Sequence, residues 1–337
     1  MQTIKSILVC GVLLATFAAD ASAGAIIGWA VGGDATTIWN TVDGGDTWKP
    51  QSTGLPAGGS IRGLSAVGAT NVWAVGDSGI ILHSENGGVN WASQMGGPPK
   101  SFSKVQFVDT LNGWVVGPSG IIQHTSNGGV TWESETSAST EGIDSVHFAD
   151  SQNGWAVGFQ IQHTSNGGAT WALESRPFGL ILASVDFIDA QNGWAVGSDS
   201  NIQHTINGGA TWSRQISAGG TQFQSVDFVD ASNGWVVGFG GVILHTANGG
   251  LSWAAQNSGT ALNLNSIEFT DTQNGWIVGT GGTILHTTDG GLTWAAQSSG
   301  TSVPLWDVAF ATVPEPSTGV LAVIAGAMLW WWRKWFK

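Results

Sequence analysis

The 337-residue sequence contains no tyrosine and a single cysteine, and only 10% of its residues are charged. Without tyrosine, catalysis by a tyrosine nucleophile is excluded. Cys10 has no second cysteine to pair with, so the fold must be stabilised by packing alone. Between residues 24 and 313 there are six lysines and arginines against 21 acidic residues, a net charge of −15. Nucleic acid and anionic lipid are poor partners for so acidic a surface.

Residues 24–313 also lack the 3.6-residue periodicity of amphipathic helices. They are rich instead in glycine and tryptophan, and fourteen of the 20 tryptophans form two regular series. Neighbours in the first series are 39 to 44 residues apart. A period near 40 residues built from strand-like units is typical of a propeller, a solenoid or an array. The two series are Trp29, Trp73, Trp114, Trp155, Trp194, Trp235 and Trp276, and Trp48, Trp91, Trp132, Trp171, Trp212, Trp253 and Trp294.

Each repeat predicts four short strands. The first has the alternating pattern of Ser184–Phe187, the second is Gly-Trp-x-Val-Gly, the third is Ile-x-His-Thr, and the fourth begins at the second tryptophan. Asp-x-x-Asn-Gly separates the first two strands, and Asn-Gly-Gly or Asp-Gly-Gly separates the last two. Both segments predict tight turns, because Asx side chains bond the nearby backbone and glycine adopts positive φ.

The second turn, Thr-x-Asp/Asn-Gly-Gly-x-Thr/Ser-Trp, resembles the Asp-box, or bacterial neuraminidase repeat. The resemblance implies a folding device in which the Asx residue caps the turn and the tryptophan packs between sheets. Asp-box propellers include sialidases, but those enzymes need an arginine cluster and a tyrosine nucleophile. The seven Asx residues are Asp43, Asn86, Asn127, Asn166, Asn207, Asn248 and Asp289.

The two ends of the repeat region predict a closed ring. The first repeat, residues 26–53, lacks a first strand, and a strand of that type follows the last repeat at residues 305–310. Joining them makes an all-β, seven-bladed propeller of four-stranded blades over residues 24–313, which leaves no large open edge. An open solenoid would need atypical capping repeats, and the sequence has none.

The first 23 residues predict a secretory signal peptide. Lys5 precedes an apolar run over residues 7–19, and Ala21-Ser22-Ala23 suits cleavage after Ala23. Lipid attachment at Cys10 is the alternative, and the absence of small residues before it argues against that. The propeller is therefore expected to be exported.

Residues 314–337 have a different character. Pro314-Glu315-Pro316 precedes an uncharged run over residues 318–332 and a basic end. This tail resembles the PEP-CTERM sorting signal, which implies recognition by an exosortase-type enzyme in a Gram-negative bacterium. The protein would pass through an inner-membrane-anchored intermediate to the cell surface or exopolysaccharide matrix. The apolar run is short for a bilayer, which needs about 20 residues, and the alternative is a plain single-pass anchor.

Residues 26–310 as a whole resemble the photosystem II stability and assembly factor family, whose members repeat Gly-Trp-x-Val-Gly, Ile-x-His-Thr and Asp-Gly-Gly-x-Thr-Trp in a seven-bladed ring. The resemblance implies the fold more firmly than the function. Members that act in photosystem assembly use an arginine-rich face, whereas Arg62, Arg176 and Arg214 are the only arginines in these residues.

Chemically active side chains recur once per repeat. Six histidines occupy equivalent places, which in a ring do not converge on one point, so we interpret them as structural and expect neither metal nor cofactor. His147, outside this series, is assigned no role. Asp186 with Asp189, and Asp227 with Asp230, are interpreted as turn caps instead of acid/base pairs. The six histidines are His83, His124, His163, His204, His245 and His286.

A binding surface is expected on the face opposite the two regular turns, because the connections there differ between repeats. Phe159, Arg176, Phe178 and Phe239 are the predicted ligand-binding residues, since exposed aromatic and arginine side chains are common in interfaces. The alternative is that these phenylalanines fill gaps between blades.

Together these features predict an exported, monomeric, noncatalytic binding or structural module. Its expected partners are the exosortase-type enzyme and an extracellular polysaccharide or surface protein. Two alternatives stay open: an extracellular glycan hydrolase of the Asp-box type, and a chaperone for a membrane complex that resembles an assembly factor.

Overall fold

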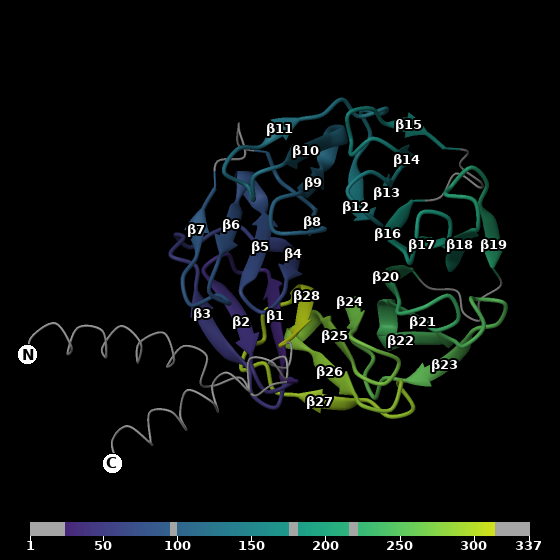
Figure 1. Ribbon diagram of the computed structural model, residues 1–337. Coiled ribbons are helices and arrows are strands. Elements are labelled where there is room, and N and C mark those ends of the chain that lie inside the picture. Colours follow the sequence, from purple (N-terminus) through teal and green to yellow (C-terminus); the bar gives the residue numbers. More distant parts are fainter. Residues whose placement is uncertain (1–23, 95–99, 175–180, 216–221, 314–337) are drawn as a thin grey trace, which may run out of the picture.

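Seven four-stranded antiparallel sheets surround a central channel in the computed structural model, which describes residues 24–94, 100–174, 181–215 and 222–313 (Figure 1). The chain is therefore the all-β, seven-bladed propeller that the repeats predict. Blade 1 contains β28 and β1–β3, and blades 2 to 7 follow in chain order from β4–β7 to β24–β27. The predicted signal peptide and sorting tail lie outside the described residues.

The strands follow the four parts of the repeat. The innermost strands are β4 (Ile61–Val67), β8 (Lys104–Phe107), β12 (Ile143–Phe148), β16 (Leu182–Phe187), β20 (Phe223–Phe228), β24 (Leu264–Phe269) and β28 (Leu305–Thr312). The second strands are β1 (Ile26–Gly32), β5 (Asn71–Gly76), β9 (Gly113–Gly117), β13 (Gly154–Gly158), β17 (Gly193–Gly197), β21 (Gly234–Gly238) and β25 (Gly275–Gly279).

The third strands are β2 (Thr37–Thr41), β6 (Ile81–Ser84), β10 (Ile121–Thr125), β14 (Ile161–Thr164), β18 (Asn201–Thr205), β22 (Val242–Thr246) and β26 (Ile284–Thr287). The outer strands begin one residue after the second tryptophan, slightly later than expected, and are β3 (Lys49–Ser52), β7 (Ala92–Ser93), β11 (Glu133–Ser134), β15 (Ala172–Leu173), β19 (Ser213–Gln215), β23 (Ala254–Asn257) and β27 (Ala295–Gln297).

Short 3₁₀ turns connect some second and third strands, namely η1 (Asp77–Gly79), η2 (Pro118–Gly120), η3 (Phe239–Gly241) and η4 (Thr280–Gly282). No helix among the described residues has the length and apolar character that a membrane span requires.

The ring is closed by the last strand of the chain. β28 pairs antiparallel with β1, from Ile26 opposite Thr312 to Gly32 opposite Leu305. It thereby supplies the innermost strand of blade 1, whose other three strands come from the opposite end of the chain. The closing strand extends two residues beyond the expected residues 305–310.

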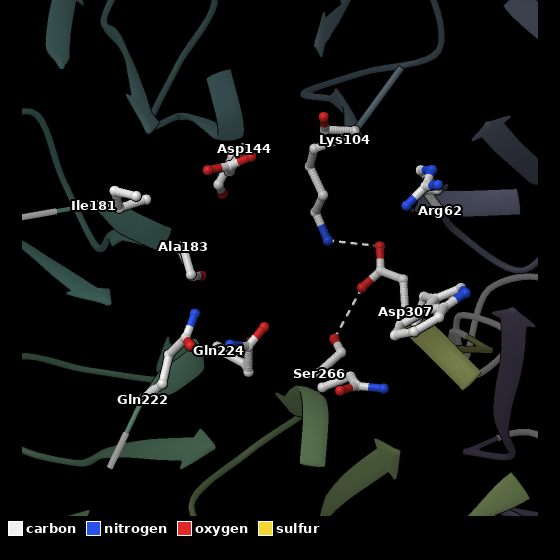
Figure 2. A pocket seen from close by; sticks show the side chains of 15 residues that line it. Arg62, Lys104, Asp144, Ile181, Ala183, Gln222, Gln224, Ser266 and Asp307 are labelled. Carbon is white, nitrogen blue, oxygen red and sulfur yellow. Dashed lines mark hydrogen bonds and ion pairs between the residues drawn. The ribbon is translucent and has the colours of Figure 1, made fainter. Parts of the chain in front are cut away.

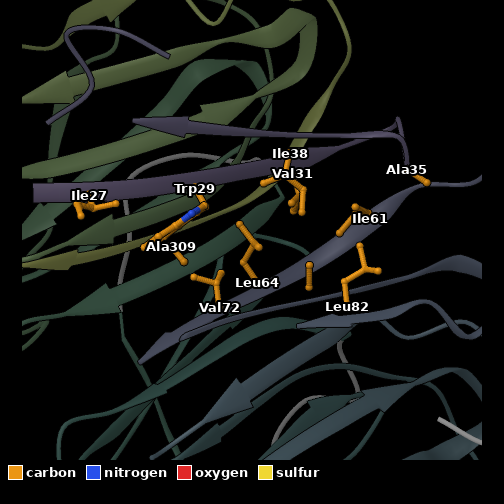
Figure 3. Close-up of a cluster of buried hydrophobic side chains, with 11 residues drawn as sticks. Ile27, Trp29, Val31, Ala35, Ile38, Ile61, Leu64, Val72, Leu82 and Ala309 are labelled. Carbon is orange, nitrogen blue, oxygen red and sulfur yellow. The ribbon is translucent and has the colours of Figure 1, made fainter. Parts of the chain in front are cut away.

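The core consists of apolar layers between neighbouring blades. Figure 3 shows one of them between blades 1 and 2, where Trp29 lies among Leu64, Val72 and other aliphatic side chains. Ala66 occupies the place that phenylalanine takes in the other innermost strands, so this layer is built from aliphatic residues.

In the other layers a phenylalanine lies between two tryptophans. The Phe228 ring stacks on Trp194 of the preceding blade, with centroids 3.6 Å apart, and meets Trp253 of its own blade edge-on at 5.9 Å. Gly234 opposite it must lack a side chain, because a β-carbon there would collide with the Phe228 ring. Each such aromatic pair stabilises the folded state by about 0.5–1.5 kcal/mol beyond the contribution of its buried apolar area.

The first tryptophan of every repeat also joins its blade to the next. Its side chain is buried, and its indole N–H donates to a glycine carbonyl in the following Asp-box turn at 2.8–3.3 Å. The last of these bonds, from Trp276 to Gly44, joins blade 7 to blade 1. The repeat spacing is therefore also the spacing of the bonds that hold the ring together.

Candidate binding face and central channel

The two regular turns of each blade lie on one face of the ring, here called the turn face. In blade 6 the Gly249 N–H donates to the Ser232 carbonyl at 2.9 Å, which joins the Asp-box turn to the turn between the first two strands. Equivalent bonds join the two turns in blades 2 to 5 and 7. Blade 1 has no turn between its first two strands, and there the Gly44 N–H donates to the Ile26 carbonyl of β1 at 3.0 Å. The opposite face, here called the loop face, carries the loops between second and third strands and the links between blades.

The seven Asx residues of the Asp-box make the same local bonds. In blade 6 the Thr246 hydroxyl donates to Asn248 Oδ1 at 2.9 Å and accepts the Gly250 N–H at 2.8 Å. Asn248 Oδ1 also accepts the Ser252 N–H at 3.0 Å. These bonds occupy the polar groups of the turn locally, so the side chain stabilises its own loop. The equivalents are Asp43, Asn86, Asn127, Asn166, Asn207 and Asp289.

The loop face carries five exposed large apolar side chains, and Ile181 and Trp306 among them line the opening of the channel. Two of them, Phe159 and Phe239, are predicted binding residues, with exposed fractions of 42% and 38%. The other three, Ile181, Leu262 and Trp306, are exposed by 40%, 46% and 36%, and the sequence analysis did not predict them as binding residues. The other two predicted residues, Arg176 and Phe178, lie outside the described residues.

On this face the channel opens into a mouth with a volume of about 340 Å³. Figure 2 shows Arg62 and Lys104 on one side of the opening and Ile181 and Gln222 on the opposite side. Below the mouth, the channel continues into a second cavity of about 300 Å³. Six residues line both cavities, so the two are continuous: Lys104, Ser145, Ser184, Ser225, Ser266 and Asp307.

Asp307, on the closing strand, joins four blades at the base of the mouth. Its buried carboxylate accepts Lys104 Nζ at 2.6 Å and the Leu64 N–H at 2.8 Å through Oδ2 (Figure 2). Its Oδ1 accepts the Ser266 hydroxyl at 2.8 Å. Asp307 therefore links its own blade to blades 2, 3 and 7.

Three further carboxylates line the deeper channel. Asp186 and Asp227 accept the backbone N–H of Phe228 and Phe269 at 2.7 and 2.8 Å, and Glu268 accepts that of Phe310 at 3.3 Å. Innermost strands of neighbouring blades do not pair, so each carboxylate satisfies an amide on the free edge of the next blade.

The interpretation of Asp186 and Asp227 as turn caps is therefore wrong. Asp189 and Asp230 do cap their turns: Asp189 Oδ1 accepts the backbone N–H groups of the second and third residues after it, and Asp230 makes the same two bonds. The two kinds of aspartate lie three residues apart in sequence, but one points into the channel while the other closes a turn at the end of the strand.

The channel carboxyls are harder to ionise than ordinary ones. Burial raises the pKa of Asp186, and burial together with the adjacent Asp186 and Glu268 raises the pKa of Asp227 well above its usual value. Burial also raises the pKa of Glu268 to about 8. At neutral pH this side of the channel therefore holds protons that a nearby cation would displace.

His147 also lies in the channel, where its Nδ1 is 3.1 Å from Asp186 Oδ1. Nothing in the sequence indicates a partner for this histidine, but the structure places it against a carboxylate of the following blade. Burial lowers its pKa, which the negative charge of Asp186 partly offsets. Among the described residues, no hydroxyl or thiol is hydrogen-bonded to His147, so the pair lacks a nucleophile to activate.

The six recurrent histidines stack on tryptophans instead of converging. His286, for example, lies 4.4 Å from Trp276, centroid to centroid, with the rings nearly parallel. Burial lowers the pKa of all six. Within the described part of the chain no three His, Cys, Asp or Glu side chains are placed to hold a metal ion. Four of the histidines have a buried Nε2 without a hydrogen-bond partner there: His83, His124, His163 and His286.

The model of the family described as photosynthesis system II assembly factor YCF48 matches residues 15–97, 97–177, 173–262 and 252–313. The chain belongs to this family. Among curated proteins none matches the chain.

Two solved YCF48 structures share the fold. One, described as YCF48 bound to D1 peptide, has 22% identity and a TM-score of 0.67 over 80% of this chain and 92% of its own. The other, YCF48 from Cyanidioschyzon merolae, has 23% identity and a TM-score of 0.67 over 79% of this chain and 96% of its own. At this identity the likeness establishes the architecture alone.

The arginines of this YCF48 family member do not form a common patch in the described residues. Arg62 Nε bonds Asp77 Oδ1 at 2.7 Å on the loop face, and Arg214 Nη2 donates to the Asp199 carbonyl at 3.2 Å. Arg176 is not among the described residues. Among the described residues, the loop face and the channel below it therefore present apolar side chains and carboxylates instead of an arginine patch.

Proposed function

We propose that this protein is an exported, noncatalytic binding protein that holds a polypeptide partner on the loop face of its propeller. The observation that carries the proposal is the set of five exposed large apolar side chains on the loop face, two of which, Ile181 and Trp306, line the channel mouth. Apolar and aromatic residues grouped in this way are characteristic of protein interfaces. The turn face also exposes large apolar side chains, but they are distributed over the regular turns of five blades: Val89, Leu111, Val130, Ile206, Leu251 and Leu292.

A polypeptide is the class of partner that the family favours. One solved member of the YCF48 family is described as bound to a D1 peptide. That complex supports peptide binding as a use of this fold, whereas the identity of the peptide is not carried over. The body of this chain is acidic, with 21 acidic residues against six lysines and arginines, which favours a basic partner.

A noncatalytic role fits the chemistry of the channel. The carboxylates Asp186, Asp227 and Glu268 already accept backbone amides, and His147 faces no nucleophile among the described residues. The carboxylates stabilise the ring through these hydrogen bonds, and transferring protons to a substrate would interfere with that bonding.

The sequence pattern of the two ends supports export and sorting to the surface as part of this proposal. Cleavage after Ala23 and processing near Pro314-Glu315-Pro316 would leave the ring between them. The Gly24 N–H donates to the Val313 carbonyl at 3.1 Å, and the Val313 N–H to the Ala25 carbonyl at 2.9 Å. Residues 24 and 313, at which the two flanking segments join the ring, therefore lie at the turn face, on the side opposite the loop face.

The test compares the two faces with matched substitutions. Full-length protein, its F159S/F239S variant and an L251S/L292S variant would be used to capture partners from envelope and extracellular fractions of the source organism. Leu251 and Leu292 are exposed by 87% and 84% on the turn face, so the second variant removes at least as much exposed apolar surface as the first. We expect a specific polypeptide to be lost only with F159S/F239S. Loss only with L251S/L292S would place the binding surface on the turn face and refute the proposal.

A further inference from the structure

The apolar side chains do not surround the channel mouth evenly. Phe159 lies on blade 4, Ile181 follows it in the link to blade 5, and Phe239 lies on blade 6. Leu262 precedes blade 7, and Trp306 begins the innermost strand of blade 1. The apolar rim thus extends from blade 4 to blade 1, while the remaining sector, blades 2 and 3, carries the basic residues of the mouth.

Charge is divided in the same way below the mouth. Asp186, Asp227 and Glu268 lie on the innermost strands of blades 5, 6 and 7, directly beneath the apolar sector. Lys104 and Arg62 lie on blades 3 and 2. The side of the channel next to the apolar rim is therefore acidic, and the opposite side is basic.

The basic side is already neutralised, whereas the acidic side is not. Lys104 is paired with Asp307, and Arg62 with Asp77. Asp186 lies 3.1 Å from the His147 imidazole, and among the described residues no lysine or arginine forms an ion pair with Asp227 or Glu268. Each of these carboxyls keeps some surface open to the channel.

We infer that the polypeptide bound at this mouth is basic and apolar, with apolar side chains on the rim from blade 4 to blade 1 and a lysine or arginine side chain in the channel facing Asp227 and Glu268. This inference rests on the proposed function and specifies the chemistry of the partner. Charge complementarity selects the cationic group, and the exposed phenylalanines select its apolar neighbours.

A long cationic side chain suits this site better than a metal ion. Each carboxylate keeps one oxygen on a backbone amide of the next blade, and the described residues contain no group of three ligands placed for a metal. Lysine and arginine carry their charge at the end of an apolar stem, which can pass the rim and leave the head group in the channel.

Proton release is a second consequence. The groups that face Glu268 in the channel are Asp186, Asp227 and Asp307, with Lys104 and His147 across from them. Because burial raises the pKa of Glu268 to about 8, this carboxyl is mostly protonated below that pH in the free protein. An entering cation favours the ionised form, so affinity must rise between pH 6 and pH 8.5. Attraction to ordinary surface carboxylates would not change over this range.

The experiment uses full-length protein in mild detergent and two fluorescent nonapeptides of opposite charge that differ at two positions. The probes are Gly-Ser-Leu-Lys-Phe-Lys-Leu-Ser-Gly and the same peptide with glutamate in place of lysine, and fluorescence anisotropy gives their Kd. The test variant is D227N/E268Q, in which the side-chain carbonyls can still accept the Phe269 and Phe310 amides. The control, D46N/E85Q, removes two exposed carboxylates from the turn face.

We expect the lysine peptide to bind on the order of tenfold or more tightly than the glutamate peptide, since one charge pair in a partly enclosed site has that effect. D227N/E268Q should lose this preference and the rise with pH, while D46N/E85Q should retain both. Thermal melts at each pH would confirm that both variants are folded. Equal binding of the two peptides, equal loss in both variants, or no binding of the lysine peptide would overturn the inference.

Failure of this inference can be told apart from failure of the proposed function. If F159S/F239S weakens both peptides equally and the lysine peptide has no advantage, the loop face binds polypeptides but the charge assignment is wrong. If F159S/F239S changes neither, the binding face itself is wrong.

Discussion

Replacing Glu135 with glutamine should stabilise the propeller, and more so at high pH. In five blades a glutamine at the equivalent place donates from Nε2 to a glycine carbonyl in the next Asp-box turn at 2.9–3.5 Å. Glu135 accepts the Trp171 indole N–H at 3.0 Å, but as a carboxylate it has no proton to donate to the adjacent turn. The five glutamines are Gln51, Gln94, Gln215, Gln256 and Gln297.

The expected size follows from two contributions. Burial raises the pKa of Glu135 to about 7 from a usual value of 4.5, partly offset by the Trp171 bond. A carboxyl with a raised folded-state pKa costs no stability below pH 4.5 and its full penalty above about pH 7. That penalty would be roughly 3 kcal/mol at 1.36 kcal/mol per unit of pKa, and we reduce it by about half because water reaches the side chain. The new hydrogen bond adds about 1 kcal/mol.

Urea unfolding of E135Q and the unmodified protein at pH 5 and pH 8 would measure this effect. We expect a gain of about 1 kcal/mol at pH 5, mainly from the hydrogen bond, and about 2 to 3 kcal/mol at pH 8. The reciprocal variant Q94E should lose stability, again more at pH 8. A gain for E135Q that is the same at both pH values would refute the burial argument, and a loss would refute the hydrogen-bond argument as well.

Three further perturbations test the fold. W194A should cost about 3 to 5 kcal/mol in denaturant melts, because Trp194 fills the layer between blades 5 and 6, and a change near zero would contradict its burial. Removing residues 314–337 should leave a folded ring by circular dichroism, whereas removing residues 305–310 should expose two sheet edges and cause aggregation; unfolding by the first truncation would show that the boundary is misplaced. H286N should be less stable than the unmodified protein at pH 7. The difference in the free energy of unfolding should narrow as the pH falls below about 6.5. Burial lowers the pKa of His286, so the stability that the neutral imidazole contributes is lost when it is protonated. A gap that widens in acid would contradict this.

The fold was predictable because each repeat fixes its own strands and turns locally. Trp235, for example, belongs to a Gly-Trp-x-Val-Gly strand and bonds the next Asp-box turn, so the repeat spacing contains both the blade and its connection. The missing first strand at the N-terminus and the extra strand at residues 305–310 likewise indicated how the ring closes.

The channel was less predictable because its residues meet across blades. Asp186 and Asp189 are the same residue type three positions apart, and only their place relative to the end of β16 separates a channel carboxylate from a turn cap. Strand alternation contained a usable signal, since Asp186 shares a face with Ser184, opposite the buried Val185 and Phe187. His147 contacts a carboxylate of the following blade, and nothing in its own repeat indicates that contact.

The apolar rim was predictable only in part. Phe159 and Phe239 stand out in glycine-rich loops, whereas Ile181 and Leu262 lie in links of unequal length that have no counterpart from blade to blade. Trp306 was treated as part of the closing strand, which it is, but its side chain also reaches the mouth of the channel. Exposure depends on how neighbouring links pack, and the repeat pattern does not contain that information.

The most direct test of a polypeptide-binding loop face is site-specific photo-crosslinking in cells that produce the full-length protein. A benzophenone amino acid would replace Phe239 on the loop face or Leu251 on the turn face, and the captured segments would be sequenced by mass spectrometry. We predict that position 239 captures a recurring polypeptide segment rich in lysine or arginine and in apolar residues, and that position 251 does not. Capture by position 251 alone, or of the same segments by both positions, would contradict the account.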